Sequence, residues 1–286
     1  MKQIIADISA QLQAVYPADE AEALAWWIAE ESTGLSRSQL LCGCKITKNI
    51  PNLQDIIERL LHFEPIQYIF GHTLWYGLDL KVTPATLIPR PETAELVERI
   101  DRLRLTEYRP AAPDRTQTDN AAFRVLDIGT GSGCIAIALK KQHPQWEVRG
   151  IDISAEAIEV AKENAQRNGV EVPFKVTDIF AQNADSIGHF DIIVSNPPYI
   201  CEKEKKDMRR NVLEHEPHTA LFVPDEDPLL FYRRIAELHL GTYLFFEINE
   251  AYGAETAALL GETGYTDIHI THDIYGKARI IEGRMA

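Results

Sequence analysis

The chain has 286 residues, of which 45% are hydrophobic and 25% are charged, close to the averages for folded globular proteins. This composition excludes a disordered, collagenous or coiled-coil protein, and the length allows about two domains. With 43 acidic and 29 basic residues the formal net charge is −14, which disfavours stable binding to nucleic acid or to anionic membranes. No segment reaches the ~20 apolar residues of a membrane helix, the N-terminus has no signal core, and four cysteines are too few for a disulfide scaffold. We therefore expect a soluble, cytoplasmic protein.

Residues 1–72 are predicted to form a small helical domain. Apolar residues recur at helical spacing near the N-terminus, and Asp19 and Gly34 are placed to begin and end a second helix. Ser36 and Asn52 are candidate N-caps for two further helices because their side-chain oxygens can accept backbone N–H groups. Each helix is short, so these helices must pack together to form a core.

Residues 73–91 are predicted to form a hairpin and a stiff connector. Every second residue from Leu74 to Val82 is apolar, which is typical of a strand or hairpin with one buried face. Three prolines follow between residues 84 and 91, and their fixed backbone torsions favour an extended linker over a flexible tether.

Residues 92–286 are predicted to form the larger domain. Segments with strand character alternate with helices that begin near Glu92, Ser132, Ser154 and Pro228, which indicates an α/β fold with a mostly parallel sheet. The polar residues 106–122 are expected to form a surface loop, and the last two strands an antiparallel hairpin at the sheet edge. The predicted strands are Arg124–Ile128, Glu147–Ile153, Phe174–Thr177, Phe190–Ser195, Tyr243–Ile248, Ile268–Thr271 and Ala278–Ile281.

A glycine-rich turn, Gly129-Thr130-Gly131-Ser132-Gly133, follows the first of these strands. Its G-x-G-x-G spacing lets the backbone approach a ligand closely, but it lacks the third glycine position of a dinucleotide fingerprint. Asp152 ends the next strand, where a carboxylate can accept both hydroxyl protons of a ribose, and Asp178 ends the third, within reach of an adenine amino group. Together with Asp127 before the turn, these acidic residues suit S-adenosyl-L-methionine, which carries a positive charge.

The fourth strand leads directly into Asn196-Pro197-Pro198-Tyr199, the most specific motif of the chain. An amide or exocyclic amino nitrogen is a poor nucleophile because its lone pair is delocalised. The Asn196 side-chain oxygen and a proline carbonyl could accept both N–H groups of such a nitrogen and stabilise its developing charge. Tyr199 supplies a flat ring against which a planar group can stack. Asn196, Pro197 and Tyr199 are thus the predicted catalytic residues, Pro198 joins them in substrate binding, and no metal is required.

These motifs resemble the protein-(glutamine-N(5)) methyltransferases that modify peptide-chain release factors, the HemK/PrmC family. The resemblance covers nearly the whole chain and includes the segment from Leu87 to Thr93, which reads LIPRPET. It implies a Rossmann-like class I S-adenosylmethionine-dependent methyltransferase domain with a mostly parallel seven-stranded sheet, preceded by a small helical domain and a β-hairpin. It also implies that the cofactor contacts the glycine turn, Asp152, Ile179 and Asn196, while residues 196–199 hold the glutamine of a Gly-Gly-Gln tripeptide.

The function implied is methylation of that glutamine's side-chain amide nitrogen, in a monomer whose partners are release factors. Because the helical domain has its own core and a stiff connector, we expect it to recognise the folded release factor. Neither stable nucleic-acid binding nor membrane binding is expected.

Alternative functions share parts of this pattern. An adenine-amino DNA or RNA methyltransferase can carry the same Asn-Pro-Pro-aromatic motif, but the net charge of −14 and the lack of a basic domain disfavour it. A glutamine methyltransferase acting on a ribosomal protein fits the motifs equally, whereas the glycine spacing disfavours a nicotinamide dehydrogenase.

The charged run 203–210 is interpreted as a solvated helix or a flap over the protein substrate. Cys42 and Cys44 lack the partners of a zinc site.

Overall fold

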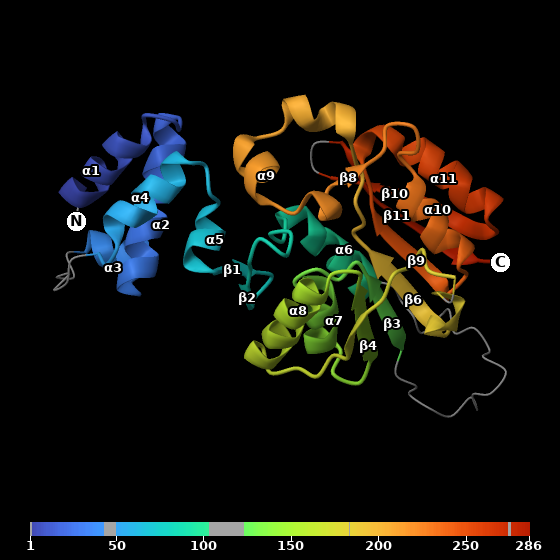
Figure 1. Cartoon of the computed structure of the whole chain (residues 1–286). Coiled ribbons are helices and arrows are strands. Elements are labelled where there is room, and N and C mark those ends of the chain that lie inside the picture. The colour runs from blue at the N-terminus through green and yellow to red at the C-terminus, as the bar shows by residue number, and fades with distance from the viewer. Residues whose placement is uncertain (1, 43–49, 103–122, 183, 274–275) are drawn as a thin grey trace. The chain divides into compact units, whose positions relative to one another are not determined.

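The computed structural model describes residues 2–42, 50–102, 123–182, 184–273 and 276–286 (Figure 1). The chain divides into a smaller unit, Met1–Gly71 with Arg209–His215, and a larger unit, His72–Met208 with Glu216–Ala286. The hairpin and the connector both fall within the larger unit. Segment 209–215, which the sequence places inside the larger domain, groups with the smaller unit.

The smaller unit is helical and has a core of its own. Ile8, Leu12, Ile28 and Ile57 are buried at its centre because the apolar faces of its helices meet there. Arg210 of the grouped segment places its guanidinium 4.1 Å from the centre of the Phe63 ring. The helices are α1 (Lys2–Leu12), α2 (Ala18–Thr33), α3 (Arg37–Leu41), α4 (Leu53–Leu61), α5 (Ile66–Phe70) and α9 (Arg210–His215).

The ends of these helices test the predicted caps. Gly34 ends α2 in the left-handed conformation (φ 68°), and the Ser36 hydroxyl accepts the N–H of the third residue of α3, as predicted. Two caps are wrong in detail. Pro17 holds the position before α2, so Asp19 falls in the first turn, where its charge favours the helix dipole instead. Asn52 precedes α4 but has positive φ (55°), and its side chain makes no capping hydrogen bond.

The predicted hairpin is present as β1 (His72–Trp75) and β2 (Leu78–Lys81). Its two-residue turn, Tyr76-Gly77, has positive φ at both positions, as a tight hairpin turn requires. Because Trp75 pairs directly with Leu78, these two residues share the buried face. The single alternation predicted from Leu74 onward is therefore wrong before the turn, and Leu74 is 77% exposed.

The larger unit contains a seven-stranded sheet in the order β10-β11-β9-β6-β3-β4-β5, which confirms the predicted fold class. The strands β9, β6, β3, β4 and β5 run parallel to one another. The C-terminal pair, β10 and β11, is antiparallel, as predicted. β11 lies beside β9, so only β10 of that pair forms the sheet edge. The strands are β3 (Arg124–Ile128), β4 (Glu147–Asp152), β5 (Phe174–Val176), β6 (Phe190–Ser195), β9 (Gly241–Glu247), β10 (Tyr265–His272) and β11 (Ala278–Met285).

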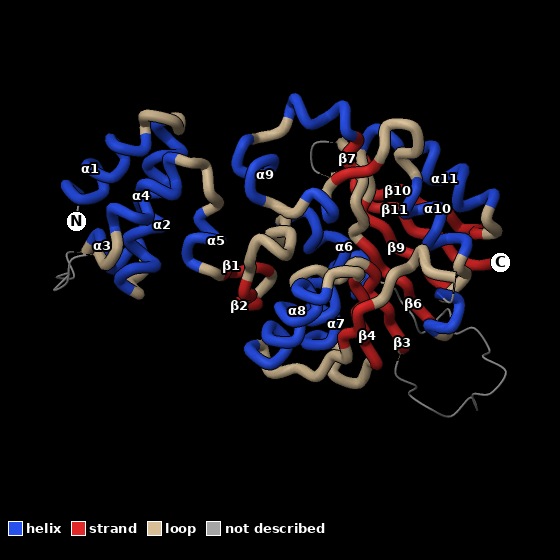
Figure 2. The backbone as a smooth tube through the Cα atoms, viewed as in Figure 1, coloured by secondary structure: helices blue, strands red, loops and turns tan. Residues whose placement is uncertain are grey.

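Helices cover both faces of this sheet, and Figure 2 shows the strands between them. Successive strand residues point to opposite faces, so Val125 packs under α6, α7 and α8, and Leu126 packs under α10 and α11. α11 has no counterpart among the predicted helices. The bounds are α6 (Pro91–Asp101), α7 (Cys134–Gln142), α8 (Ala155–Arg167), α10 (Leu230–Glu237) and α11 (Gly253–Glu262).

Several sequence predictions concern smaller features. The charged run 203–210 lies mainly in a 3-10 helix, Glu202–Asp207, which follows a short strand β7 (Ile200–Cys201) paired with β8 (Phe222–Val223). The predicted loop 106–122 and Cys44 lie outside the described residues. Over the ranges that the structure does describe, no helix combines the length and apolar character needed to cross a membrane.

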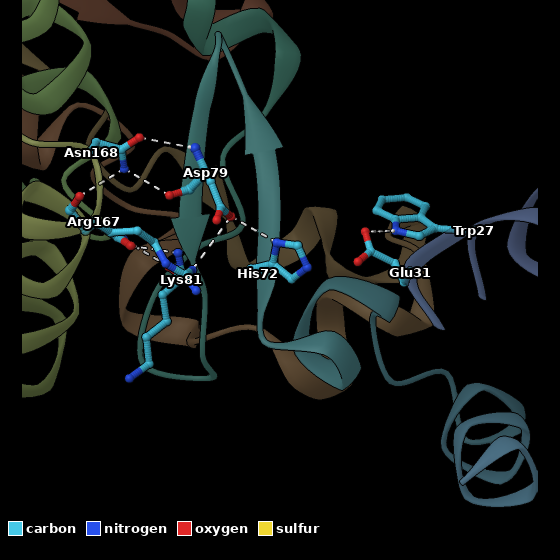
Figure 3. A network of polar contacts seen from close by, with 8 residues as sticks. Trp27, Glu31, His72, Asp79, Lys81, Arg167 and Asn168 are labelled. Atoms are coloured by element: carbon cyan, nitrogen blue, oxygen red, sulfur yellow. Dashed lines mark hydrogen bonds and ion pairs between the residues drawn. The ribbon is translucent and has the colours of Figure 1, made fainter. Parts of the chain in front are cut away.

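Asn164 on α8 and Asn168, the residue directly after that helix, hold the hairpin to the sheet domain, and Figure 3 shows Asn168 beside Asp79. Asn168 accepts the N–H of Asp79 and donates to its carbonyl, and Asn164 makes the same pair of bonds with Lys81. The two side-chain amides thus satisfy the backbone N–H and C=O groups of β2 that a neighbouring strand would otherwise bind. Asn164 also donates to the carbonyl of Ser132 at 2.9 Å, which links the hairpin to the glycine turn.

Candidate active site

A cavity of about 440 Å³ opens at the carboxyl ends of β3, β4 and β6, where α/β sheets commonly bind ligands. All residues that line it belong to the larger unit. They come from the connector, the glycine turn, the ends of four strands, the segment after α9, and the helices α6, α7, α8 and α10. The lining includes Thr86, Arg90, Thr93, Gly129, Thr130, Gly131, Ser132, Asp152, Asp178, Ile179, Phe180, Asn196, Pro197, Pro198 and Phe222.

The glycine turn joins β3 to α7 and forms one wall of the cavity. Gly129, Gly131 and Gly133 all have positive φ, a conformation that other residues adopt only with strain. At Gly133 a Cβ atom would also lie 3.0 Å from Ile137 Cδ1 and 3.1 Å from Ala161 Cβ. The turn therefore requires glycine for its conformation and, at Gly133, for the close approach of α7 and α8.

Asp152, at the end of β4, faces the turn from the neighbouring strand. Its Oδ2 accepts the N–H of Gly131 and its Oδ1 accepts the N–H of Ser154, both at 2.9 Å. These two bonds fix the orientation of the carboxylate at the cavity wall. Each oxygen retains a second lone pair, so the group can still accept two hydroxyl protons.

Asp127 lies behind the turn and does not line the cavity. Its Oδ2 accepts the Thr130 hydroxyl at 2.6 Å and the N–H of Ala136 at 3.2 Å, which tie the turn to the start of α7. Its Oδ1 has no hydrogen-bond partner among the described residues. Burial raises the pKa of Asp127 to about 7. Its role in this structure is to hold the turn in place.

We expect Asp127→Asn to change how the free energy of unfolding depends on pH. Because the folded-state pKa of about 7 lies above the ordinary 3.8, the folded protein retains a proton that the unfolded chain releases. This contribution to stability is complete below about pH 4 and is lost as the pH rises through about 7. Denaturant unfolding at about pH 5 and pH 8 should show a larger loss in the wild type than in the variant. Equal losses would contradict the raised pKa.

The segment after β5 forms the wall next to Asp152. Ile179 is buried there and Phe180 is partly exposed, and both line the cavity. Asp178 is exposed, lies two residues beyond the end of β5, and accepts the N–H of Phe180 at 2.8 Å. Arg234 of α10 donates to the carbonyl of Ile179 at 2.7 Å and so anchors the segment.

Asn196, Pro197 and Pro198 line the cavity directly after β6. Asn196 Nδ2 donates to the Thr93 hydroxyl oxygen at 3.2 Å, and that hydroxyl in turn donates to Glu247 Oε2 at 2.7 Å. The amide of Asn196 is therefore held by its nitrogen, which leaves its oxygen as the acceptor.

Tyr199 is not among the residues that line the cavity. Its hydroxyl donates to Glu247 Oε1 at 3.1 Å, and its carbonyl accepts from Asn249 Nδ2 at 3.1 Å. Burial, and then the charge of Glu247, raise the pKa of Tyr199 far above its ordinary value. The sequence motif predicts a role for the ring face of Tyr199 alone, and no motif marks Glu247. A glutamate at the end of an otherwise apolar strand is the signal that could have identified it.

An ion pair between a half-buried arginine and a buried glutamate joins two segments that line the cavity. Arg90 donates to Glu216 Oε1 at 2.6 Å, and Glu216 Oε2 accepts the N–H of Ile88 at 3.2 Å. The Glu216 side chain is fully buried. Removing Arg90 would leave the buried Glu216 carboxylate without its cation, so the pair holds the connector against the segment after α9. No pattern in the sequence predicts this pairing of residues that lie 126 positions apart.

Comparison with known proteins identifies the family. Residues 3–71 match the family model described as PrmC N-terminal domain, and residues 115–220 match Methyltransferase small domain. A release factor glutamine methyltransferase of Bacteroides thetaiotaomicron is 44% identical over 98% of this chain and 99% of its own length. One of Flavobacterium psychrophilum is 41% identical over 95% and 94%. The chain belongs to the release factor glutamine methyltransferase family.

Membership of the release factor glutamine methyltransferase family confirms the predicted resemblance and the predicted class of enzyme. Among solved structures, the hMettl16 catalytic domain in complex with a MAT2A 3′UTR hairpin aligns with a TM-score of 0.55 and 16% identity. That alignment covers 74% of this chain and 77% of the other. This likeness concerns the methyltransferase fold alone.

Proposed function

We propose that this enzyme methylates the side-chain amide nitrogen of the glutamine in the Gly-Gly-Gln motif of peptide-chain release factors, with S-adenosyl-L-methionine as methyl donor. The observation that carries the proposal is the fixed amide of Asn196, whose oxygen is left to accept at a cavity shared with Asp152 and the glycine turn. The names of its relatives supply the class of protein substrate.

The residues of the cavity fit this cofactor. When bound, S-adenosyl-L-methionine supplies a methyl group on a positively charged sulfonium. Asp152 is proposed to accept the ribose hydroxyls with the lone pairs that Gly131 and Ser154 leave unused. Asp178 and Ile179 are proposed to contact the adenine, and Gly129 and its neighbours in the turn the amino-acid end. The negative charge at the strand ends favours a cation there.

The glutamine amide is proposed to bind at residues 196–199. Asn196 Oδ1 and the carbonyl of Pro197 each accept one N–H of the substrate nitrogen, which orients it and stabilises the positive charge that develops on it. Pro197 and Pro198 restrict the backbone, so these acceptors are already in place before the substrate binds. Tyr199 does not line the cavity itself, and its ring is proposed to stack against the planar amide once the substrate occupies the site.

Methyl transfer to purified proteins tests the proposal. The full-length enzyme is incubated with isotope-labelled S-adenosyl-L-methionine and a release factor, and the modified residue is located by mass spectrometry. We expect one methyl group on the glutamine of Gly-Gly-Gln. Parallel reactions contain ribosomal proteins or adenine-containing DNA and RNA. Labelling of either alternative substrate without labelling of the release factor would overturn the proposal.

We further propose that the smaller unit recognises the folded release factor. Its separate core and its match to the PrmC N-terminal domain support this role. A shortened chain that begins at residue 72 keeps the hairpin bonded to α8. We expect it to bind cofactor and to methylate a short Gly-Gly-Gln peptide, but to methylate intact release factor at least about tenfold less efficiently. Full efficiency on the intact protein would contradict this role.

A further inference from the structure

A buried carboxylate lies two hydrogen bonds away from Asn196. Glu247 ends β9 and is 3% exposed, and Thr93 of α6 is 2% exposed. Glu247 accepts the Thr93 hydroxyl on one oxygen and the Tyr199 hydroxyl on the other. The proposed chemistry at Asn196 makes no direct use of this carboxylate. A buried charge is costly unless it serves as a hydrogen-bond partner, so its presence needs an explanation.

The number of protons in this network determines the orientation of Asn196. A hydroxyl has a single proton, and Thr93 donates its proton to Glu247. The Thr93 oxygen can then only accept, so Asn196 must present its NH₂ group to it. The Asn196 side-chain oxygen, at the other end of the amide, therefore points away from Thr93. The proposed function needs an acceptor for the substrate nitrogen at that position.

We propose that Glu247 is a positioning residue that, acting through Thr93 and only as a carboxylate, holds Asn196 in the orientation that accepts from the substrate amide. The proposal rests on the function proposed above and adds to it a dependence on one buried charge. If Glu247 gains a proton and donates it to the Thr93 oxygen, the Thr93 hydroxyl proton is freed to bond Asn196 Oδ1. The side-chain amide of Asn196 then rotates so that its NH₂ group faces the NH₂ group of the substrate. Two hydrogen-bond donors face each other in this arrangement, so the substrate nitrogen loses its acceptor.

The surroundings of Glu247 favour such a switch. Burial, and to a lesser extent the negative charge of Glu92, raise the pKa of Glu247 above its ordinary value, whereas Arg279 and the two hydroxyl donors lower it. Activity is therefore present above the pKa of Glu247 and is lost as the pH falls through it. The titratable or charged groups that face Glu247 from neighbouring elements are Glu92, Cys134, Tyr199, Tyr232 and Arg279, and Thr93 adds a neutral hydroxyl.

Rate measurements on variants test this role with the full-length enzyme. We expect Thr93→Val to lower kcat by about 10- to 100-fold at neutral pH, with cofactor affinity nearly unchanged. Thr93→Ser keeps the hydroxyl and should restore most of the rate. The wild type should lose kcat in an acid limb, and Glu247→Gln should lack that limb. If Thr93→Val keeps the wild-type rate, or if Glu247→Gln keeps the acid limb, the proposal is wrong.

Tyr232→Phe is the matched control. The Tyr232 hydroxyl is buried and donates to the backbone carbonyl of Glu247 at 3.2 Å, so its loss leaves both side-chain oxygens with their partners. We expect kcat within about twofold of the wild type and an unchanged pH profile. If this variant loses the rate as Thr93→Val does and the acid limb as Glu247→Gln does, packing around Glu247 explains both results and the proposal is overturned.

A spectroscopic measurement separates this proposal from the proposed function. The side-chain NH₂ resonances of Asn196, recorded by nitrogen-15 NMR during a pH titration, should move with the titration of Glu247 in the wild type. They should stop moving in Thr93→Val and in Glu247→Gln. This result in an enzyme that does not methylate release factor would refute the proposed function and leave the positioning role standing. A wild-type resonance that does not follow Glu247 would refute the positioning role even in an active enzyme.

Discussion

Asn196→Ala is expected to lower the single-turnover rate of methyl transfer to a folded release factor by about 10²–10³-fold. The variant removes one acceptor already oriented toward the developing charge, a loss worth roughly 3–4 kcal/mol. Affinity for S-adenosyl-L-methionine should remain nearly unchanged, because Asp152 and the glycine turn are untouched. Rapid-quench kinetics for the rate and calorimetry for the affinity measure the two effects separately. A variant that loses cofactor affinity but keeps its rate would contradict the assignment of Asn196 to the substrate.

Asn196→Asp separates the oxygen of the amide from its nitrogen. The carboxylate keeps an acceptor for the substrate but loses the donor to Thr93, and it adds a negative charge close to buried Glu247. We therefore expect a poor enzyme in spite of the similar shape.

Tyr199 provides the comparison within the same motif. Tyr199→Phe keeps the ring and should lose far less rate than Asn196→Ala above the pKa of Glu247, whereas Tyr199→Ala should lose much more than Tyr199→Phe. The hydroxyl does have a partner, since it donates to Glu247, so Tyr199→Phe should also raise the pKa of Glu247. If Tyr199→Phe is as slow as Asn196→Ala at every pH, the hydroxyl takes part in catalysis and the stacking role is wrong.

Asp152→Ala is expected to weaken cofactor binding by about 2–3 kcal/mol, or roughly 30- to 150-fold in Kd. Two hydrogen bonds to the ribose would be lost, and the N–H groups of Gly131 and Ser154 would lose their acceptor. Calorimetry with S-adenosyl-L-methionine and with its demethylated product measures the change. Unchanged affinity for both ligands would refute the ribose assignment.

Asp191→Ala is a suitable control for this measurement. Asp191 also accepts a backbone N–H, that of Arg124 at 2.7 Å, but it lies at the opposite end of the parallel strands. Its loss should lower stability and leave cofactor affinity unchanged. A comparable loss of affinity in both variants would indicate general destabilisation of the sheet.

Local sequence was sufficient to predict the strands whose bounds are set by neighbouring residues. The bounds predicted for β3 and β6, Arg124–Ile128 and Phe190–Ser195, agree with the structure because each is an apolar run closed by a turn. The glycine turn and Asp152 could be assigned to one site for a related reason. The carboxyl ends of adjacent parallel strands meet at one edge of the sheet, so strand order alone brings them together.

Pairings over long sequence separations could not be read in this way. Thr93 bonds Glu247 across 154 positions and Arg90 bonds Glu216 across 126, and no periodicity in the chain indicates such partners. Leu74 was placed on the wrong face because alternation along the chain does not continue through a two-residue turn.

The motifs of this chain already specified a methyltransferase fold and pointed to the glycine turn and Asn196 as candidate site residues, because glycine spacing, strand ends and paired prolines act over a few residues. Only the folded chain shows which atom of Asn196 is held and by what. That orientation depends on a hydroxyl of α6 and a carboxylate of β9, which lie in separate segments and meet when the helix packs on the sheet. The direction of a hydrogen bond depends on the count of donors and acceptors around it, and that count exists only once the groups are buried together.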